Sequence, residues 1–223
     1  MRPARFISSF ILIIIASVVL TGCDTPKTPT PLLVKRGNHS FEYQNWADAA
    51  KKYEEVLARE PHDGDIQYRY GVCLLNLGEY SKAESALELA HSLDPRDDGI
   101  VFSLAEALYQ KKEYGRLFTM LRDRASDNRS ISTWLVLADY AAKLNDFDTE
   151  MEALSNACAI EDGTNALPYY RTAVLLARVG RTDEAIRRLR QAYAISPEDE
   201  QVTTMLVEYG EIPGPTLGLA PGK

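Results

Sequence analysis

Apolar residues recur at the spacing of amphipathic helices from residue 30 onward, and the helical stretches themselves recur every 34 residues. Three prolines end such stretches, at Pro61, Pro95 and Pro197; the first interval is 34 residues and the second is three times as long. One residue of the period is lost near 126–130 and regained before Ala166. The pattern predicts one further helix over 200–209 and five units of two helices each, over residues 30–63, 64–97, 98–130, 131–165 and 166–199.

Small and aromatic residues occupy fixed places within this repeated unit. A small residue on the first helix lets the second helix approach closely, and an aromatic residue at the start of the second helix fills the space behind it. Gly78 and Gly180 suit the left-handed residue that ends a helix, and Ser81 with Glu84 has the spacing of a capping box. The small residues are Gly37, Gly71, Ala105, Ala138 and Ala173, and the aromatic residues are Trp46, Tyr80, Tyr114 and Phe147.

The second unit resembles the tetratricopeptide repeat, in which Trp, Leu-Gly, Tyr, Ala, Phe and a late Pro recur at fixed spacing. Its matching residues are Tyr70-Gly71, Leu74, Gly78, Tyr80, Ala83, Leu87, Ala90 and Pro95. The third and fourth units depart from the pattern, with Leu117 and Glu150 in a column where the family has Ala. The resemblance implies an all-α fold, a tetratricopeptide-type α-solenoid of about five helix–turn–helix repeats with a C-terminal capping helix, over residues 32–209.

The amino-terminal segment has the layout of a bacterial export signal. Arg2 and Arg5 precede an apolar run over residues 6–20, which is shorter than the roughly 20 residues that a membrane-spanning helix needs. The following Leu20-Thr21-Gly22-Cys23 resembles the lipobox of bacterial lipoproteins, which implies cleavage after residue 22 and lipidation of Cys23. Residues 1–22 are therefore the expected signal peptide. The alternative is an uncleaved signal anchor in which Cys23 has no role.

Proline-rich segments flank the expected solenoid. Residues 23–31 contain the candidate lipidated Cys and a Pro/Thr tether, and residues 210–223 contain three prolines and four glycines. A chain of this composition is extended or flexible and does not hold a helix. We expect the tether to hold the folded part away from the membrane and the tail over residues 210–223 to be disordered.

Composition and motifs narrow the classes of function. The net charge of −7 opposes binding to nucleic acid, and the three histidines fall at dissimilar places in the repeat, which disfavours a shared metal site. The sequence has no His-Glu-x-x-His, Gly-x-Ser-x-Gly, Cys-x-x-Cys or phosphate-binding glycine loop. We expect no enzymatic activity, no cofactor, no metal site and no small-molecule substrate. Cys73 and Cys158 lie two units apart and are expected to be separate buried thiols.

One face of the first helix in each unit offers candidate binding residues, because positions i, i+4 and i+7 of a helix share a face. Tetratricopeptide proteins usually turn this face toward their groove. Aromatic side chains there would anchor a peptide or helix of a partner, and polar side chains would orient it. The candidate anchors are Tyr68, Phe102, Tyr109 and Tyr170, and the candidate orienting residues are Asn38, Glu106 and Asp139. The alternative is that this column packs between neighbouring first helices as core.

These features predict a lipid-anchored scaffold for protein–protein interaction in the bacterial cell envelope, on the extracytoplasmic (periplasmic) side of a membrane. In general plan the chain resembles repeat lipoproteins that assist assembly of pili, secretion pores or envelope complexes, which implies a protein partner. The alternative is an accessory or regulatory subunit of a cell-wall or membrane enzyme. Six arginines within residues 166–199 would suit an acidic partner or lipid headgroups, although a solvated helix face is the simpler interpretation.

Overall fold

The computed structural model describes residues 28–220, and within this range the chain forms five helix pairs and one final helix. Each two-helix unit predicted from the repeat holds one pair, so the predicted all-α architecture is confirmed. The helices are α1 (Thr30–Glu42), α2 (Trp46–Leu57), α3 (Gly64–Asn76), α4 (Tyr80–Leu93), α5 (Asp98–Gln110), α6 (Tyr114–Asn128), α7 (Ile131–Lys143), α8 (Phe147–Ile160), α9 (Leu167–Arg178), α10 (Thr182–Ile195) and α11 (Glu200–Glu208).

The amino-terminal predictions fall mostly outside the described residues. The expected signal peptide (residues 1–22), Cys23 and the first part of the tether lie there, and their assignments stay predictions. None of the helices described is long and apolar enough to cross a membrane. The last two tether residues, Thr30 and Pro31, instead open α1. Proline fits the first turn of a helix because an N–H at that position has no partner within the helix.

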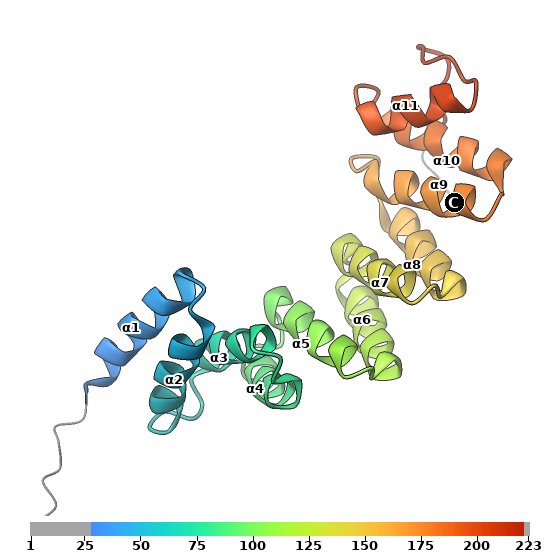
Figure 1. Ribbon diagram of the computed structural model, residues 1–223. Helices are drawn as coiled ribbons and strands as arrows, with labels where there is room; N and C mark the ends of the chain where they lie inside the picture. The colour runs from blue at the N-terminus through green and yellow to red at the C-terminus, as the bar shows by residue number, and fades with distance from the viewer. Residues whose placement is uncertain (1–27, 221–223) are drawn as a thin grey trace, which may run out of the picture.

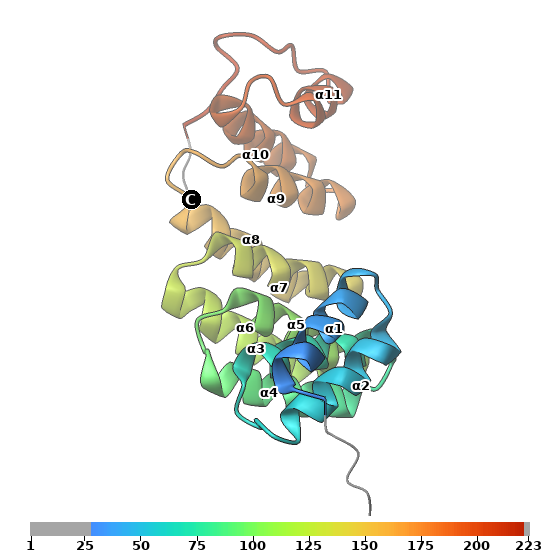
Figure 2. The ribbon, with the colours of Figure 1, turned by 90° about the vertical axis from the view of Figure 1, so that its left-hand side faces the viewer.

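The helix pairs are stacked in chain order. Each helix packs on the helices that precede and follow it in the sequence, and α3 also contacts α5. A solenoid has this nearest-neighbour pattern, because each unit touches only the adjacent units. Figure 1 shows the units following one another along an arc, with α1, α5 and α7 toward its inner side and α2, α6 and α8 toward its outer side. Figure 2 shows α11 at the end of the stack farthest from α1.

The turn inside each helix pair has one left-handed residue at an equivalent position. The φ angles of these residues lie between 56° and 77°. In each turn the next backbone N–H donates to a carbonyl five residues earlier, as Glu79 does to Leu74 at 2.9 Å, which is the bond of a Schellman motif. The expected roles of Gly78 and Gly180 are confirmed. The five left-handed residues are Gln44, Gly78, Lys112, Asn145 and Gly180.

Close approach within a pair depends on the small residue of the first helix. A Cβ atom placed on Gly71 of α3 would lie 2.6 Å from Cγ of Leu87 on α4. A Cβ atom on Gly37 of α1 would lie 2.8 Å from Cε1 of Tyr53 on α2. Both distances are shorter than real carbon contacts, so the second helix lies where a side chain on the first would otherwise be.

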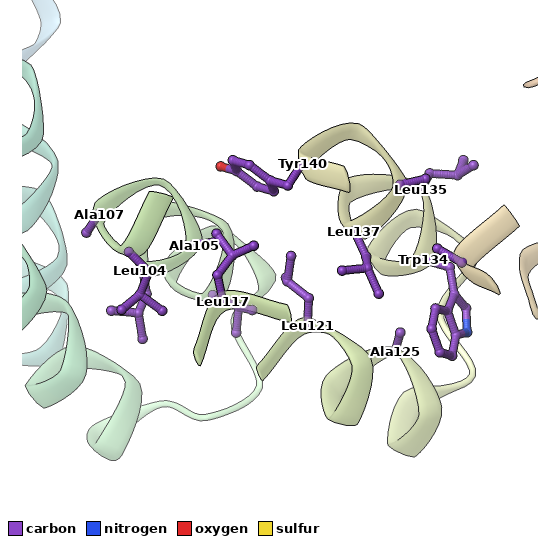
Figure 3. Packing of buried hydrophobic residues seen from close by; sticks show 14 of the residues in the cluster. Leu104, Ala105, Ala107, Leu117, Leu121, Ala125, Trp134, Leu135, Leu137 and Tyr140 are labelled. Atoms are coloured by element: carbon purple, nitrogen blue, oxygen red, sulfur yellow. The ribbon is translucent and has the colours of Figure 1, made fainter. Parts of the chain in front are cut away.

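Three clusters of buried apolar side chains run along the stack. The first joins α1 to α3, the largest extends from α3 to α9, and the last joins α8 to α11. In Figure 3, Leu117 of α6 lies close to Ala105 of α5, and Leu121 of α6 lies close to Leu137 of α7. The core is therefore continuous between units rather than confined to each pair.

The predicted capping box at the start of α4 is wrong. The N-cap residue of α4 is Glu79, whose side chain makes no capping hydrogen bond, and Ser81 lies inside the helix. Glu84 is buried and accepts hydrogen bonds from Lys111 and Arg116 of the third unit. A buried carboxylate needs cationic partners, and these two link the second unit to the third.

The expectation of a disordered tail is wrong for residues 211–220, which fold back on α10. Leu217 is only 8% exposed and packs into the last apolar cluster. The backbone N–H of Leu219 donates to the carbonyl of Arg190 at 3.0 Å, and Nε of Arg190 donates to the carbonyl of Leu217 at 2.8 Å. Between α11 and residue 220 the chain forms no further helix, and Leu217 packs against this part of the core. Residues 221–223 lie outside the described range.

Substitution of Gly71 by Ala tests the close approach of α3 and α4. The new methyl group would overlap Leu87, and overpacking of a tight core typically costs about 1–3 kcal/mol of unfolding free energy. Urea unfolding followed by circular dichroism measures this loss. The control is Gly115→Ala on α6, where a Cβ would meet nothing within 4 Å and stability should stay equal or rise slightly. Equal stabilities for the two variants would contradict the packing argument.

Candidate partner-binding groove

The four predicted anchors lie on the first helices of three units, and each is half-buried. Tyr68 on α3 and Phe102 and Tyr109 on α5 pack against the largest core cluster, and Tyr170 on α9 packs against the last one. The alternative interpretation, that this column contributes to the core, therefore holds in part, and the binding role of these residues stays a prediction. One side of each ring contributes to the core, and the remaining surface of each side chain is accessible.

Tyr109 lies at the centre of an aromatic group that joins the third and fourth units. Its ring centroid is 5.2 Å from that of Tyr140 on α7 and 5.9 Å from that of Tyr114 on α6. Nζ of Lys143 lies 4.5 Å from the Tyr140 centroid and 5.2 Å from the Tyr109 centroid. An ammonium group at these distances is attracted to the faces of both rings. We call Tyr109, Tyr140 and Lys143 the central aromatic group.

Glu106 is held by the same group. It accepts a hydrogen bond of 2.9 Å from the hydroxyl of Tyr140 and one of 2.6 Å from Nε2 of Gln110. Burial, and then the hydrogen bond to Glu106, raises the pKa of Tyr140 above its ordinary value. The predicted orienting residue Glu106 thus already orients a tyrosine of the next unit.

The other two predicted orienting residues also have partners within the chain. Oδ1 of Asn38 accepts a hydrogen bond of 2.8 Å from the hydroxyl of Tyr53, which is fully buried between α1 and α2. Asp139 forms an ion pair with Arg171 of the next unit, and Arg171 also donates to the carbonyl of Leu135 at 3.4 Å. Asn38 therefore fixes the first helix pair, and Asp139 fixes the fourth unit to the fifth.

A pocket of about 530 Å³ lies between α9 and α11. It includes the predicted anchor Tyr170, but the α11 residues that form its other wall were expected only to cover the end of the stack. Val174 is 40% exposed at this position, although it is apolar. We call this site the terminal pocket. Its lining residues are Tyr170, Val174, Glu200, Gln201, Thr204, Met205 and Glu208.

Lys143 and the α11 wall of the terminal pocket are the site residues that the sequence analysis missed. Lys143 follows Tyr140 by three residues, a spacing that places two side chains on one side of a helix, so a signal for this contact was present in the sequence. The pocket is lined by α9 and α11 together, and the repeat pattern alone does not show where α11 lies relative to α9.

Most arginines of the fifth unit are engaged within the fold. Arg178 pairs with the buried Glu150 of α8, and Arg181 pairs with Glu184 at 2.6 Å. With Arg171 on Asp139, Arg188 on Gln191 at 3.0 Å and Arg190 on the tail, five of the six have contacts within the fold. The pair with Arg178 also explains how Glu150 is tolerated where the family pattern has Ala. The guanidinium group of Arg178, from the next unit, neutralises the buried carboxylate.

Cys73 and Cys158 are both buried free thiols, as predicted. Burial raises the pKa of Cys73 to about 12, and it also raises the pKa of Cys158. A thiol attacks as its thiolate, so neither side chain has the character of a nucleophile. Within residues 28–220 no three His, Cys, Asp or Glu side chains are grouped as a metal site would require.

Alkaline titration tests the central aromatic group. The pKa of Tyr140 is higher in the folded chain than in the unfolded chain, where it is about 10, so its contribution to stability is complete below about pH 10 and is lost as the pH rises through the folded value. Tyr140→Phe should therefore flatten the fall in unfolding free energy above pH 10, as measured by urea unfolding at several pH values. The exposed Tyr43→Phe is the control and should keep the wild-type slope; identical slopes for both variants would contradict the assignment.

Comparison with known proteins supports the repeat assignment. Residues 40–108 match the family model described as tetratricopeptide repeat. The mouse tetratricopeptide repeat protein 21A is 22% identical over 184 residues, which are 79% of this chain and 14% of that protein. The TPR repeat-containing protein YsoA of Bacillus subtilis (strain 168) is 25% identical over 129 residues, 54% of this chain and 38% of that protein. The matches thus span less than half the length of either relative.

Solved structures with the same arrangement of helices include MamA from Desulfovibrio magneticus RS-1 and YrrB. MamA gives a TM-score of 0.59 at 15% identity, over 77% of this chain and 97% of that chain. YrrB, described as a TPR protein with an unusual peptide-binding site, gives a TM-score of 0.54 at 14% identity, over 79% of this chain and 91% of that chain. At these identities the likeness shows the fold alone, and it confirms the predicted tetratricopeptide-type α-solenoid.

Proposed function

We propose that this tetratricopeptide-type solenoid is a scaffold that holds a segment of another envelope protein, and that a lipid on Cys23 anchors it on the extracytoplasmic side of a bacterial membrane. The observation that carries the binding role is the set of half-buried aromatic side chains on the first helices: Tyr68, Phe102, Tyr109 and Tyr170. They lie on the first helices of the second, third and fifth units, and an elongated partner segment can contact several of them.

The packing of these rings makes them suitable anchors. Because one side of each ring is held by the core, little side-chain entropy is lost when a partner covers the other side. Tyrosine combines a large apolar ring with a hydroxyl that forms hydrogen bonds, and such residues dominate the energetics of many interfaces. Lys143 lies above Tyr109 and can donate to a carbonyl or carboxylate oxygen of the bound segment.

The comparison with YrrB supports a search for a peptide. YrrB is described as a TPR protein with an unusual peptide-binding site, and its fold resembles that of the present chain. The likeness supports one point, which is that a solenoid of this fold is able to bind a peptide. The residues proposed to contact the partner come from the present structure.

The anchoring role is proposed from the sequence. Leu20-Thr21-Gly22-Cys23 follows a basic and apolar export segment, and a Pro/Thr tether connects Cys23 to α1. A lipidated Cys with more than one acyl chain gives stable membrane attachment, whereas a single chain gives only reversible attachment. The tether would place the solenoid within reach of envelope proteins, and assembly of an envelope complex is the role that we propose for it.

Capture of partners from a bacterial envelope extract tests the groove. The triple variant Tyr68→Ala/Phe102→Ala/Tyr109→Ala should retain at most about one thirtieth of the wild-type affinity for the partner, since loss of interface anchors costs about 2 kcal/mol or more. Quantitative mass spectrometry of the captured proteins measures the loss. The matched control replaces three aromatic residues away from these faces, Tyr43, Tyr80 and Phe118, with Ala. Equal recovery of every partner by the wild type and the groove variant would overturn the binding role.

Metabolic labelling with an alkyne fatty acid tests the anchor. The full chain expressed in a lipoprotein-processing bacterium should incorporate the label and sediment with membranes. Cys23→Ala should abolish the label, and Cys73→Ala, which removes a buried thiol, should keep it. Mass spectrometry that finds Cys23 unmodified in the wild-type chain would contradict the proposed lipidation.

A further inference from the structure

We infer that the terminal pocket binds a short extended segment in which an apolar side chain lies between two basic ones. The inference rests on the proposed function, because the pocket lies beside one of the proposed anchors, Tyr170. It adds to that function the chemistry of the partner: a basic segment with an apolar centre rather than an acidic or neutral one.

The floor of the terminal pocket is apolar and accessible. Its apolar lining residues are Tyr170 and Val174 of α9 and Met205 of α11, and Val174 keeps 40% of its surface exposed. Methionine adapts its shape to different apolar side chains, which suits a recognition surface. The volume of about 530 Å³ lies within the range of about 300–1,000 Å³ that is common for ligand sites. One aliphatic side chain with its adjoining backbone fits this space.

The rim of the pocket is acidic, and its charges are not neutralised by the chain. Glu200 and Glu208 both line the pocket and are exposed, and within residues 28–220 neither forms an ion pair. Two acids on the first helices of earlier units differ from them: Glu106 accepts from Tyr140, and Asp139 pairs with Arg171. Two free carboxylates beside an apolar floor favour a ligand with positive charge and disfavour an acidic one.

The spacing of the two carboxylates sets the form of the ligand. Glu200 and Glu208 are eight residues apart on α11, which corresponds to about 12 Å along the helix at 1.5 Å per residue. In an extended chain residues i and i+4 are about 13 Å apart, and i, i+2 and i+4 point to the same side. Two basic residues at i and i+4 can therefore reach the two carboxylates while the residue at i+2 enters the apolar floor. Basic residues at i and i+4 of a helix are only about 6 Å apart and do not span the rim.

The test uses the full chain in a nonionic detergent and fluorescence anisotropy of labelled peptides. The probe is Gly-Lys-Ser-Leu-Ser-Lys-Gly, and the comparison peptides replace both Lys by Glu or replace Leu by Ser. We expect the probe to bind at least tenfold more tightly than the Glu peptide and at least threefold more tightly than the Ser peptide. We also expect its affinity to fall as the salt concentration rises.

The matched variants separate the terminal pocket from general negative charge. Glu200→Gln/Glu208→Gln removes both rim charges at nearly constant size and should weaken binding of the probe at least fivefold. Glu55→Gln/Glu198→Gln removes two exposed carboxylates outside the pocket and should change the affinity less than twofold. Circular dichroism and the thermal midpoint confirm that each variant is folded.

Equal binding of the Lys and Glu peptides, equal loss for both pairs of variants, or no binding of the probe at millimolar concentration would each overturn the inference. The outcomes for the proposed function are distinct. If the Tyr68/Phe102/Tyr109 variant loses its partners while the Glu200/Glu208 variant binds the probe unchanged, the groove function stands and the terminal pocket assignment falls. If that aromatic variant captures every partner, the proposed function itself fails.

Discussion

Close contact between two helices that cannot bury their apolar faces alone is the constraint on which the rest of the structure depends. Each first helix meets its second helix at a small residue, and at Gly71 even one added carbon would overlap the facing leucine. Ala49, Ala83 and Ala185, on the second helices, are fully buried. In the second and third units the first helices, α3 and α5, also contact each other, and Tyr68 and Phe102 lie on these two helices against the largest core cluster.

Ion pairs between neighbouring units help to align these units relative to each other, in addition to the apolar packing. Glu84 binds cations of the third unit, Glu150 binds Arg178 of the fifth, and Arg122 pairs with Glu152 of the fourth at 2.8 Å. An exposed ion pair contributes only about 0–1 kcal/mol, and a buried carboxylate without its cation is costly. These pairs therefore act mainly by excluding other registers between units, while buried leucine and alanine supply the stability.

The periodic part of the fold could be predicted from the sequence, and the non-periodic part could not. A small residue recurs at one position of every unit, as Gly37 and Gly71 do in the first two. Each occurrence therefore supports the assignment of the others. Leu217 has no equivalent in any unit; its burial depends on an uncovered end of the core that exists only after α10 and α11 have packed. The same holds for the site: the aromatic column was visible in the sequence, but the contact of Lys143 with Tyr109 joins two units and needed the structure.

The end of a solenoid is also where its surface chemistry changes. Inside the stack, two acids on the first helices meet a donor or a cation of the following unit: Glu106 meets Tyr140, and Asp139 meets Arg171. No helical unit follows α11 within the described residues, and the tail that covers the core there packs on α10 instead. The acids of α11 are therefore left facing solvent beside an apolar floor. Unlike Glu106 and Asp139, Glu200 and Glu208 of α11 combine charge that no ion pair within the described residues uses with an adjacent apolar surface, and this combination is what a partner of opposite charge can recognise.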